Sequence, residues 1–119
     1  MNILIADDNI DTAESLLEAL ELEGCLVKLA FGGAEAIEMY RSGSFDLVLM
    51  DMKMPNVDGR EATRQILGMD PNARIVIVTG NIVREDVEQI SQMGIVDILR
   101  KPFHFSELLK VISQEMGTN

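Results

Sequence analysis

Short runs of aliphatic residues recur along the chain, separated by longer stretches of mixed polarity. Each run is about the length of a β-strand and is rich in Ile and Val, which favour strands. A continuous run is also typical of a strand that is buried on both faces. We therefore predict five strands, over residues 3–6, 26–30, 47–50, 75–78 and 95–99.

The stretches between these runs carry apolar residues three and four positions apart, which is the spacing of an amphipathic helix. Gly24, Gly43, the pair Asp70-Pro71 and Gly94 stand where the first four helices would end. The apolar positions of the five helices are Ile10, Ala13, Leu16, Leu17 and Leu20; Ala36, Ile37 and Tyr40; Ala62, Ile66 and Leu67; Val83, Val87 and Ile90; and Phe105, Leu108, Leu109 and Ile112.

Strands that alternate with helices predict an α/β fold with a parallel sheet and right-handed crossovers. The second run contains Lys28 and the fifth contains Asp97, and charged residues commonly mark the edge strands of a sheet. The uninterrupted first, third and fourth runs then form the centre. The simplest arrangement is a doubly wound, flavodoxin-like (βα)5 fold with strand order 2-1-3-4-5.

Reactive side chains follow the predicted strands directly. Asp7 and Asp8 follow the first, Asp51 the third, Thr79 the fourth and Lys101 the fifth. Because the carboxyl ends of parallel strands share one edge of the sheet, we expect these groups to meet there.

Carboxylates this close together repel one another unless a cation or protons intervene. Mg²⁺ prefers oxygen ligands and phosphate oxygens, and a carboxylate beside it can attack phosphorus. A lysine ammonium and a threonine hydroxyl can stabilise phosphoryl oxygens. The set therefore indicates phosphoryl transfer.

The chain has 119 residues, with 20 acidic and 10 basic side chains and a formal net charge of −10. This length fits one domain, residues 1–119, and 47% hydrophobic residues suffice for a core. The negative charge argues against direct binding of nucleic acid or of an anionic membrane, both of which are held by Lys and Arg. Cys25 is the single cysteine and is expected to be buried. With no signal-peptide pattern at the N-terminus, we expect a cytoplasmic protein.

Four fragments of the sequence resemble the receiver domain of response regulators. They are residues 3–8, residues 46–51 followed by Met54-Pro55 and Asp58-Gly59, Thr79-Gly80, and Lys101-Pro102-Phe103. The resemblance covers essentially the whole chain. Because the chain begins with Met1 and ends on a short polar segment, a stand-alone regulator is expected, and the receiver portion of a larger regulator is the alternative.

The resemblance implies that Asp51 accepts a phosphoryl group from a histidine of a sensor kinase or of a histidine phosphotransfer protein. It implies further that Asp8, Asp51 and the backbone carbonyl of Lys53 bind Mg²⁺, with Asp7 acting through a metal-bound water. Thr79 and Lys101 would stabilise the phosphoryl group. The Lys101–Pro102 bond is expected to be cis, which would place the ammonium over the site.

The resemblance also suggests where protein partners dock. Kinase or phosphotransfer helices would pack near the first helix and the loop before the last one. The residues of this surface are Asn9, Asp11, Thr12, Ser15, Pro102 and Phe103. A further, downstream protein target is possible, and Met52 and Met54 beside the site would offer it an adaptable surface.

Three positions suggest how this chain differs from other receivers. Lys53 and Asn81 occupy positions that tune the lifetime of the phosphoryl group, and Asp51-Met52-Lys53 resembles the single-domain regulators of the sporulation phosphorelay. A charged Lys53 cannot act as a base toward water, so we expect slow self-dephosphorylation. Ile98 stands where receivers usually carry Tyr or Phe, so switching would depend on Thr79 and the Gly80-Asn81 loop.

Other readings of the same residues remain open. The alternative functions are a Mg²⁺-dependent phosphatase with an aspartate nucleophile, a flavin-binding module and a degenerate receiver that serves as a scaffold. Asp7 and Asp8 could also simply cap the first helix. Lys53, which stands where such phosphatases carry a second Asp, argues against the phosphatase, and the acidic first loop argues against the flavin site.

Overall fold

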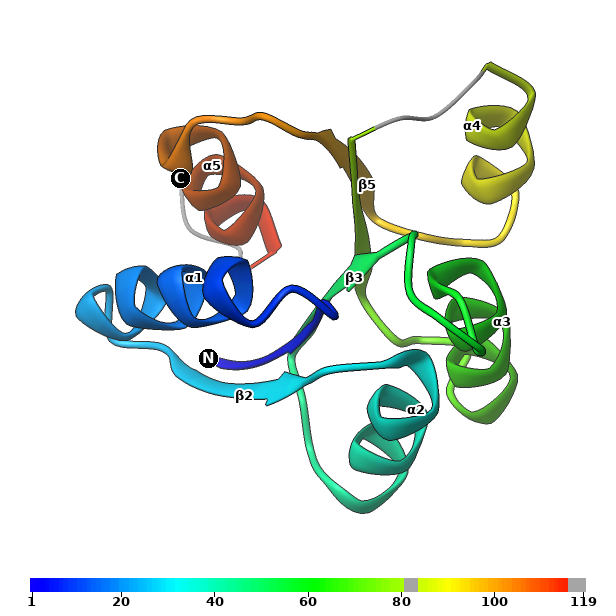
Figure 1. The fold of residues 1–119 in the computed structure, drawn as a ribbon, viewed down its shortest axis with the longest axis horizontal. Coiled ribbons are helices and arrows are strands. Elements are labelled where there is room, and N and C mark those ends of the chain that lie inside the picture. The colour runs from blue at the N-terminus through cyan, green and yellow to red at the C-terminus, as the bar shows by residue number, and fades with distance from the viewer. Residues whose placement is uncertain (81–83, 116–119) are drawn as a thin grey trace.

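The computed structural model describes residues 1–80 and 84–115 of the chain. The predicted alternation of strands and helices is confirmed (Figure 1). The elements are β1 (Asn2–Ala6), α1 (Ile10–Leu22), β2 (Leu26–Ala30), α2 (Gly33–Ser42), β3 (Leu47–Asp51), α3 (Gly59–Met69), β4 (Ile75–Thr79), α4 (Arg84–Ser91), β5 (Asp97–Arg100) and α5 (Phe105–Glu115). Val83 of the fourth predicted helix and Asn81 lie outside the described residues.

The five strands form one parallel sheet in the order β2-β1-β3-β4-β5, as predicted. Lys28 and Asp97 are exposed on the two edge strands, whereas β3 and β4 are buried along their whole length. The sequence therefore distinguishes edge from centre correctly, because only a central parallel strand is covered on both faces.

The strands β1, β3 and β4 are each one residue longer than predicted, and the last strand differs most. The last strand spans Asp97–Arg100 rather than residues 95–99. Its pairing with β4 runs from Val76–Asp97 to Thr79–Arg100, so the register of β4 sets the strand ends. Ile95 still packs against the core, which explains why it belongs to the apolar run without belonging to the strand.

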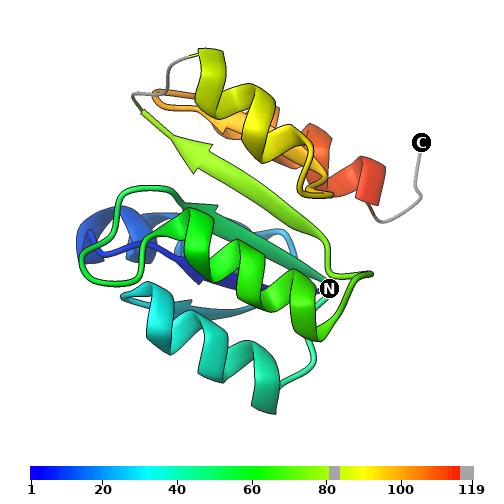
Figure 2. The ribbon, with the colours of Figure 1, turned by 90° about the vertical axis from the view of Figure 1, so that its right-hand side faces the viewer.

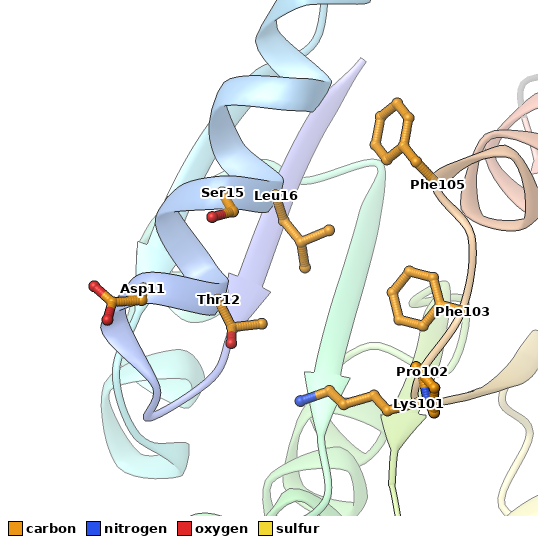
Figure 3. Close-up of a pocket in the computed structure, with 8 residues that line it drawn as sticks. All are labelled: Asp11, Thr12, Ser15, Leu16, Lys101, Pro102, Phe103 and Phe105. Atoms are coloured by element: carbon orange, nitrogen blue, oxygen red, sulfur yellow. The ribbon is translucent and has the colours of Figure 1, made fainter.

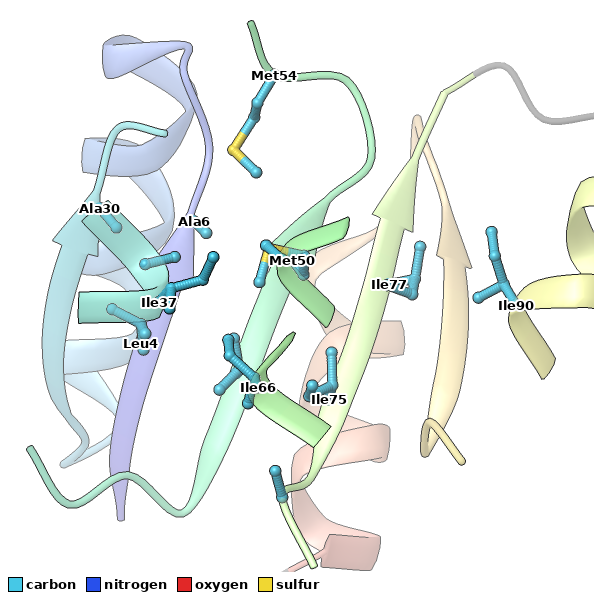
Figure 4. Packing of buried hydrophobic residues seen from close by; sticks show 14 residues of the cluster. Leu4, Ala6, Ala30, Ile37, Met50, Met54, Ile66, Ile75, Ile77 and Ile90 are labelled. Carbon is cyan, nitrogen blue, oxygen red and sulfur yellow. The ribbon is translucent and has the colours of Figure 1, made fainter. Parts of the chain in front are cut away.

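The helices cover the sheet in two groups. α1 and α5 lie on one face, while α2, α3 and α4 lie side by side on the other (Figures 1 and 2). Side chains of each strand alternate between the faces, so that Ile3 and Ile5 pack toward α1 and α5. Leu4 and Ala6 pack toward α2 and α3 on the opposite face (Figure 4). Cys25 is buried on the α1 side, as expected.

One of the buried side chains of α3 carries a polar group. Thr63 in α3 is fully buried, and its Oγ1 is the one buried side-chain oxygen or nitrogen without a hydrogen-bond partner among the described residues. An unpaired buried hydroxyl costs roughly 1–3 kcal/mol.

Thr63→Val is therefore expected to raise the free energy of unfolding by about 1 kcal/mol, because it replaces the hydroxyl with a methyl group of similar shape. Urea unfolding measures the change. Thr63→Ser keeps the hydroxyl and loses the methyl group, so it should lower stability. A gain in the serine variant would contradict this explanation.

Candidate functional site

The predicted reactive groups gather at the carboxyl ends of the strands. Asp7 follows β1, Asp51 is the last residue of β3, and Lys101 follows β5. Lys101 Nζ lies 3.3 Å from Asp7 Oδ2 and 3.8 Å from Asp51 Oδ2. Two carboxylates thus share one ammonium, although Lys101 is 94 residues from Asp7.

Asp8 completes an acidic cluster. Carboxylate oxygens of Asp7, Asp8 and Asp51 all lie within 4.8 Å of one another. Asp7 and Asp51 are buried, whereas Asp8 is exposed. Three acids paired with one lysine leave an excess of negative charge that a divalent cation with oxygen ligands would neutralise. The donor set therefore fits Mg²⁺.

The cluster opens into a cleft of about 330 Å³. Its lining residues are Asp7, Asp8, Asn9, Thr12, Asp51, Lys53, Gly80 and Lys101. The backbone N–H of Lys53 makes a long hydrogen bond of 3.4 Å to Asp51 Oδ1. Asp51 is therefore a buried carboxylate that lines an open cleft.

Thr79 lies at the predicted strand end, but its side chain is buried beside the cleft and does not line it. It ends β4 beside the site, and its carbonyl accepts a 2.7 Å hydrogen bond from the N–H of Lys101. Its side chain is almost fully buried at 1% exposure, and it is not among the described residues that line the cleft. A catalytic role for its hydroxyl stays a prediction.

The capping role considered for Asp7 and Asp8 is wrong. Asn9 is the N-cap of α1, and its side chain accepts a hydrogen bond from the N–H of Thr12. Asp7 instead accepts from the N–H of Asn9 at 2.9 Å and pairs with Lys101. Sequence reasoning placed Asn9 on the docking surface but missed its capping role, although Asn before an apolar helical pattern is a common N-cap signal.

Burial raises the pKa of Asp51 to about 6. Desolvation is the main cause, and the neighbouring charge of Asp7 adds to it, while Lys101 acts in the opposite direction. In the unfolded chain an aspartate titrates near pH ~3.9. Between these two pH values the folded protein binds more protons than the unfolded chain, so its stability falls as the pH rises through this window.

Asp51→Asn is consequently expected to stabilise the metal-free protein at pH 7.5 and to have little effect at pH 4. The gain should be about 1 kcal/mol, since water in the open cleft screens the charges. Urea unfolding in a chelating buffer measures it. The exposed Asp11→Asn serves as the control, and an equal gain at both pH values would contradict the electrostatic cause.

A second hollow, which we call the α1–α5 groove, is drawn in Figure 3. It adjoins the cleft, because Thr12 and Lys101 line both. Its volume is about 590 Å³. The lining residues are Asp11, Thr12, Ser15, Leu16, Lys101, Pro102, Phe103 and Phe105. Leu16 faces the two phenylalanines across the gap, and Lys101 lines both the groove and the cleft. Most of the surface that the sequence predicted for docking is therefore a mainly apolar groove that leads to Asp51.

Three further expectations concern the residues around the site. The Lys101–Pro102 peptide bond is cis, as expected. Ile98 is half-buried and packs against the core on the α4 side, so no aromatic ring occupies this position of β5. Met54 is buried in the same core, so it cannot offer a partner the adaptable surface that was predicted for it.

The sequence profile of the family described as Response regulator receiver domain matches residues 3–113. The chain is 37% identical over 120 residues to Two-component system protein A of Emericella nidulans, and the match covers 98% of this chain and 18% of that protein. It is also 37% identical over 110 residues to Response regulator MprA of Mycobacterium tuberculosis, covering 92% of this chain and 47% of that protein. The chain thus spans less than half the length of these relatives.

Solved structures agree with this match. A CheY-like receiver domain protein from Methanospirillum hungatei superposes with a TM-score of 0.94 at 28% identity, covering 98% of this chain and 93% of that one. A response regulator from Burkholderia pseudomallei with a phosphorylated aspartic acid and a calcium ion gives a TM-score of 0.87 at 26% identity, covering 98% and 69%.

No helix among the described residues has the length and apolar character needed to cross a bilayer. The family match decides among the functions considered from the sequence, in favour of the receiver over the phosphatase and the flavin-binding module. Since the profile extends over nearly the whole chain and the fold and strand order agree with it, the chain belongs to the receiver domain family of two-component response regulators.

Proposed function

We propose that Asp51 accepts a phosphoryl group from a phosphohistidine of a sensor kinase or of a histidine phosphotransfer protein, and that the phosphorylated state signals to a partner. The observation that carries this proposal is the geometry around Asp51. This carboxylate lies in an open cleft beside two other acids and one lysine ammonium. The phosphorylated aspartic acid of the Burkholderia relative supports it.

The transfer exchanges one bond to phosphorus for another. An Asp51 carboxylate oxygen attacks the phosphorus, the new P–O bond forms, and the P–N bond to the donor imidazole breaks. The imidazole nitrogen keeps the electron pair. Lys101, whose ammonium lies 3.8 Å from Asp51 Oδ2, would pair with the phosphoryl oxygens, and the Thr79 hydroxyl would donate a hydrogen bond to one of them.

Mg²⁺ is the cofactor that we assign to the acidic cluster. Asp8, Asp51 and the backbone carbonyl of Lys53 would hold it directly, with Asp7 acting through a bound water. When bound, the ion offsets the negative charge of the carboxylates and of the phosphoryl group. Asp7 keeps its pairing with Lys101, which orients the ammonium toward Asp51.

The donor would dock in the α1–α5 groove. Because Lys101 lines both the groove and the cleft, a helix seated between α1 and Phe103 would bring its histidine next to Asp51. The apolar lining by Leu16 and the two phenylalanines suits an amphipathic helix. Such a mode of binding needs no large rearrangement of the sheet.

Incubation with Mg²⁺ and a small acyl phosphate, followed by the mass of the intact protein, tests the proposal. The protein is expected to gain the mass of one phosphoryl group. Acyl phosphate is used because it needs no kinase, so the result depends on this chain alone. An unchanged mass with every phosphate donor, with and without Mg²⁺, would instead favour a scaffold that only binds partners.

The phosphoryl group is expected to be lost slowly. Lys53 lines the cleft, and a charged ammonium there cannot take a proton from an attacking water. The decay of the adduct after removal of the donor should therefore take minutes or longer, and Lys53→Ala should change its rate. Decay within seconds in the unsubstituted protein would contradict the expectation.

A further inference from the structure

The loop between β3 and α3, residues 52–58, carries the Lys53 carbonyl and directly follows Asp51. Met54 points from this loop back toward the sheet and is buried in the core (Figure 4). Asn56 has φ +66°, a left-handed conformation that Asn tolerates better than most residues. The loop is thus anchored by one side chain and turned at one residue.

Two glycines from different helices pack closely against the backbone of Asp51 and this loop. Gly59, the first residue of α3, approaches Asp51 so closely that a Cβ on it would lie 2.1 Å from the Asp51 carbonyl oxygen and 2.8 Å from Cα of Met52. Gly33, the first residue of α2, approaches the end of the loop, and a Cβ there would lie 2.1 Å from the Val57 carbonyl oxygen. Real Cβ atoms do not come so near a backbone atom.

The close contacts of Gly59 and Gly33 affect the site because they involve the backbone that carries Asp51 and the loop after it. Gly59 also donates its N–H to the carbonyl of Met52 at 3.1 Å, so α3 is joined to the residue between Asp51 and Lys53. Gly33 touches the far end of the same loop. Any side chain at either position must displace the segment that holds the phosphoacceptor and a metal-ligating carbonyl, or shift the helix away from it.

We propose that Gly33 and Gly59 are positioning residues of the site. By lacking side chains they let α2 and α3 pack directly on the backbone of residues 51–57, and this packing holds Asp51 and the Lys53 carbonyl at the separation that one cation requires. The inference rests on the proposed function for the identity of that cation. Neither glycine touches substrate or metal itself.

The chain provides matched controls. Gly32 adjoins Gly33, and Gly68 lies in the same helix as Gly59, yet a Cβ on either would meet nothing within 4 Å. Gly32→Ala and Gly68→Ala therefore make the same chemical change without the backbone clash.

Calorimetric titration of the metal-free proteins with Mg²⁺ tests the proposal, because it does not depend on phosphorylation. Gly59→Ala and Gly33→Ala are expected to weaken Mg²⁺ affinity about tenfold or more, as loss of supporting contacts around metal ligands typically does. The acyl phosphate reaction should slow by up to about 100-fold, since small misplacements of reacting groups have such effects. Both control variants should match the unsubstituted protein.

Urea unfolding of all four variants separates positioning from folding. If Gly59→Ala does not fold, Gly33→Ala carries the test, because Val57 lies in a loop and not in a strand. Unchanged Mg²⁺ affinity in a folded Gly33→Ala variant, or equal losses in the controls, would overturn the proposal. If Gly33→Ala and Gly59→Ala lose Mg²⁺ affinity as expected and the controls do not, but the unsubstituted protein gains no phosphoryl group, the proposed function is overturned and the positioning role stands.

Discussion

Asp51→Asn is expected to gain no phosphoryl mass after incubation with Mg²⁺ and an acyl phosphate, whereas the unsubstituted protein gains one group. An amide lacks the negative oxygen that attacks phosphorus, and it is a poorer ligand for Mg²⁺. Intact mass spectrometry, followed by analysis of peptides, measures both the loss and the site.

The matched control for this loss is Asp58→Asn. Asp58 lies in the same loop and caps α3 by accepting the N–H of Glu61 at 2.9 Å, and Asn caps a helix equally well. This variant removes one negative charge from the loop that follows Asp51 while retaining the local structure, so it should still be phosphorylated. A full adduct on Asp51→Asn would assign the phosphoryl group to a different residue.

Lys101→Ala should slow phosphorylation by about 100- to 1,000-fold, which is typical for the removal of one preorganised group that stabilises a developing charge. Lys101 contacts both buried carboxylates, at 3.3 Å and 3.8 Å. Because its charge lowers the pKa of Asp51, its removal should also shift the pH dependence of the reaction upward. Rates measured from pH 5 to pH 9 report both effects.

Two further variants make this test specific. Lys110→Ala removes an exposed lysine of α5 and should leave the rate unchanged. Lys101→Arg keeps the charge in a wider, planar group and should restore part of the rate. If Lys101→Ala reacts as fast as Lys110→Ala, the ammonium does not stabilise the phosphoryl group.

The strand order follows from the sequence because burial on both faces and exposure at an edge leave different compositions. Lys28 and Asp97 identified the outer strands. The acids and the lysine after the first, third and fifth strands meet as predicted. The ends of β5 were not predictable, because they depend on the register of its neighbour rather than on its own polarity.

Contacts between distant backbone segments could also not be predicted from the sequence. Nothing in the residues around Gly33 indicates that Val57 lies against it, since hydrophobic patterns report side-chain burial and not backbone packing. The burial of Thr79 and the inclusion of Leu16 and Phe105 in the α1–α5 groove likewise depend on how whole helices sit on the sheet. Asn9 is different, because its capping signal was present in the sequence.

The ion pair between Lys101 and Asp7 joins residues that are 94 positions apart, and so it bears on the order in which the protein folds. Long chain closures are slow and costly in entropy, so contacts of this kind form late. Mg²⁺ would then bind the folded protein, in which the acids and Lys101 have come together, and not the unfolded chain. Its binding should slow unfolding more than it accelerates folding. The ion would then lengthen the lifetime of the folded state in addition to taking part in signalling.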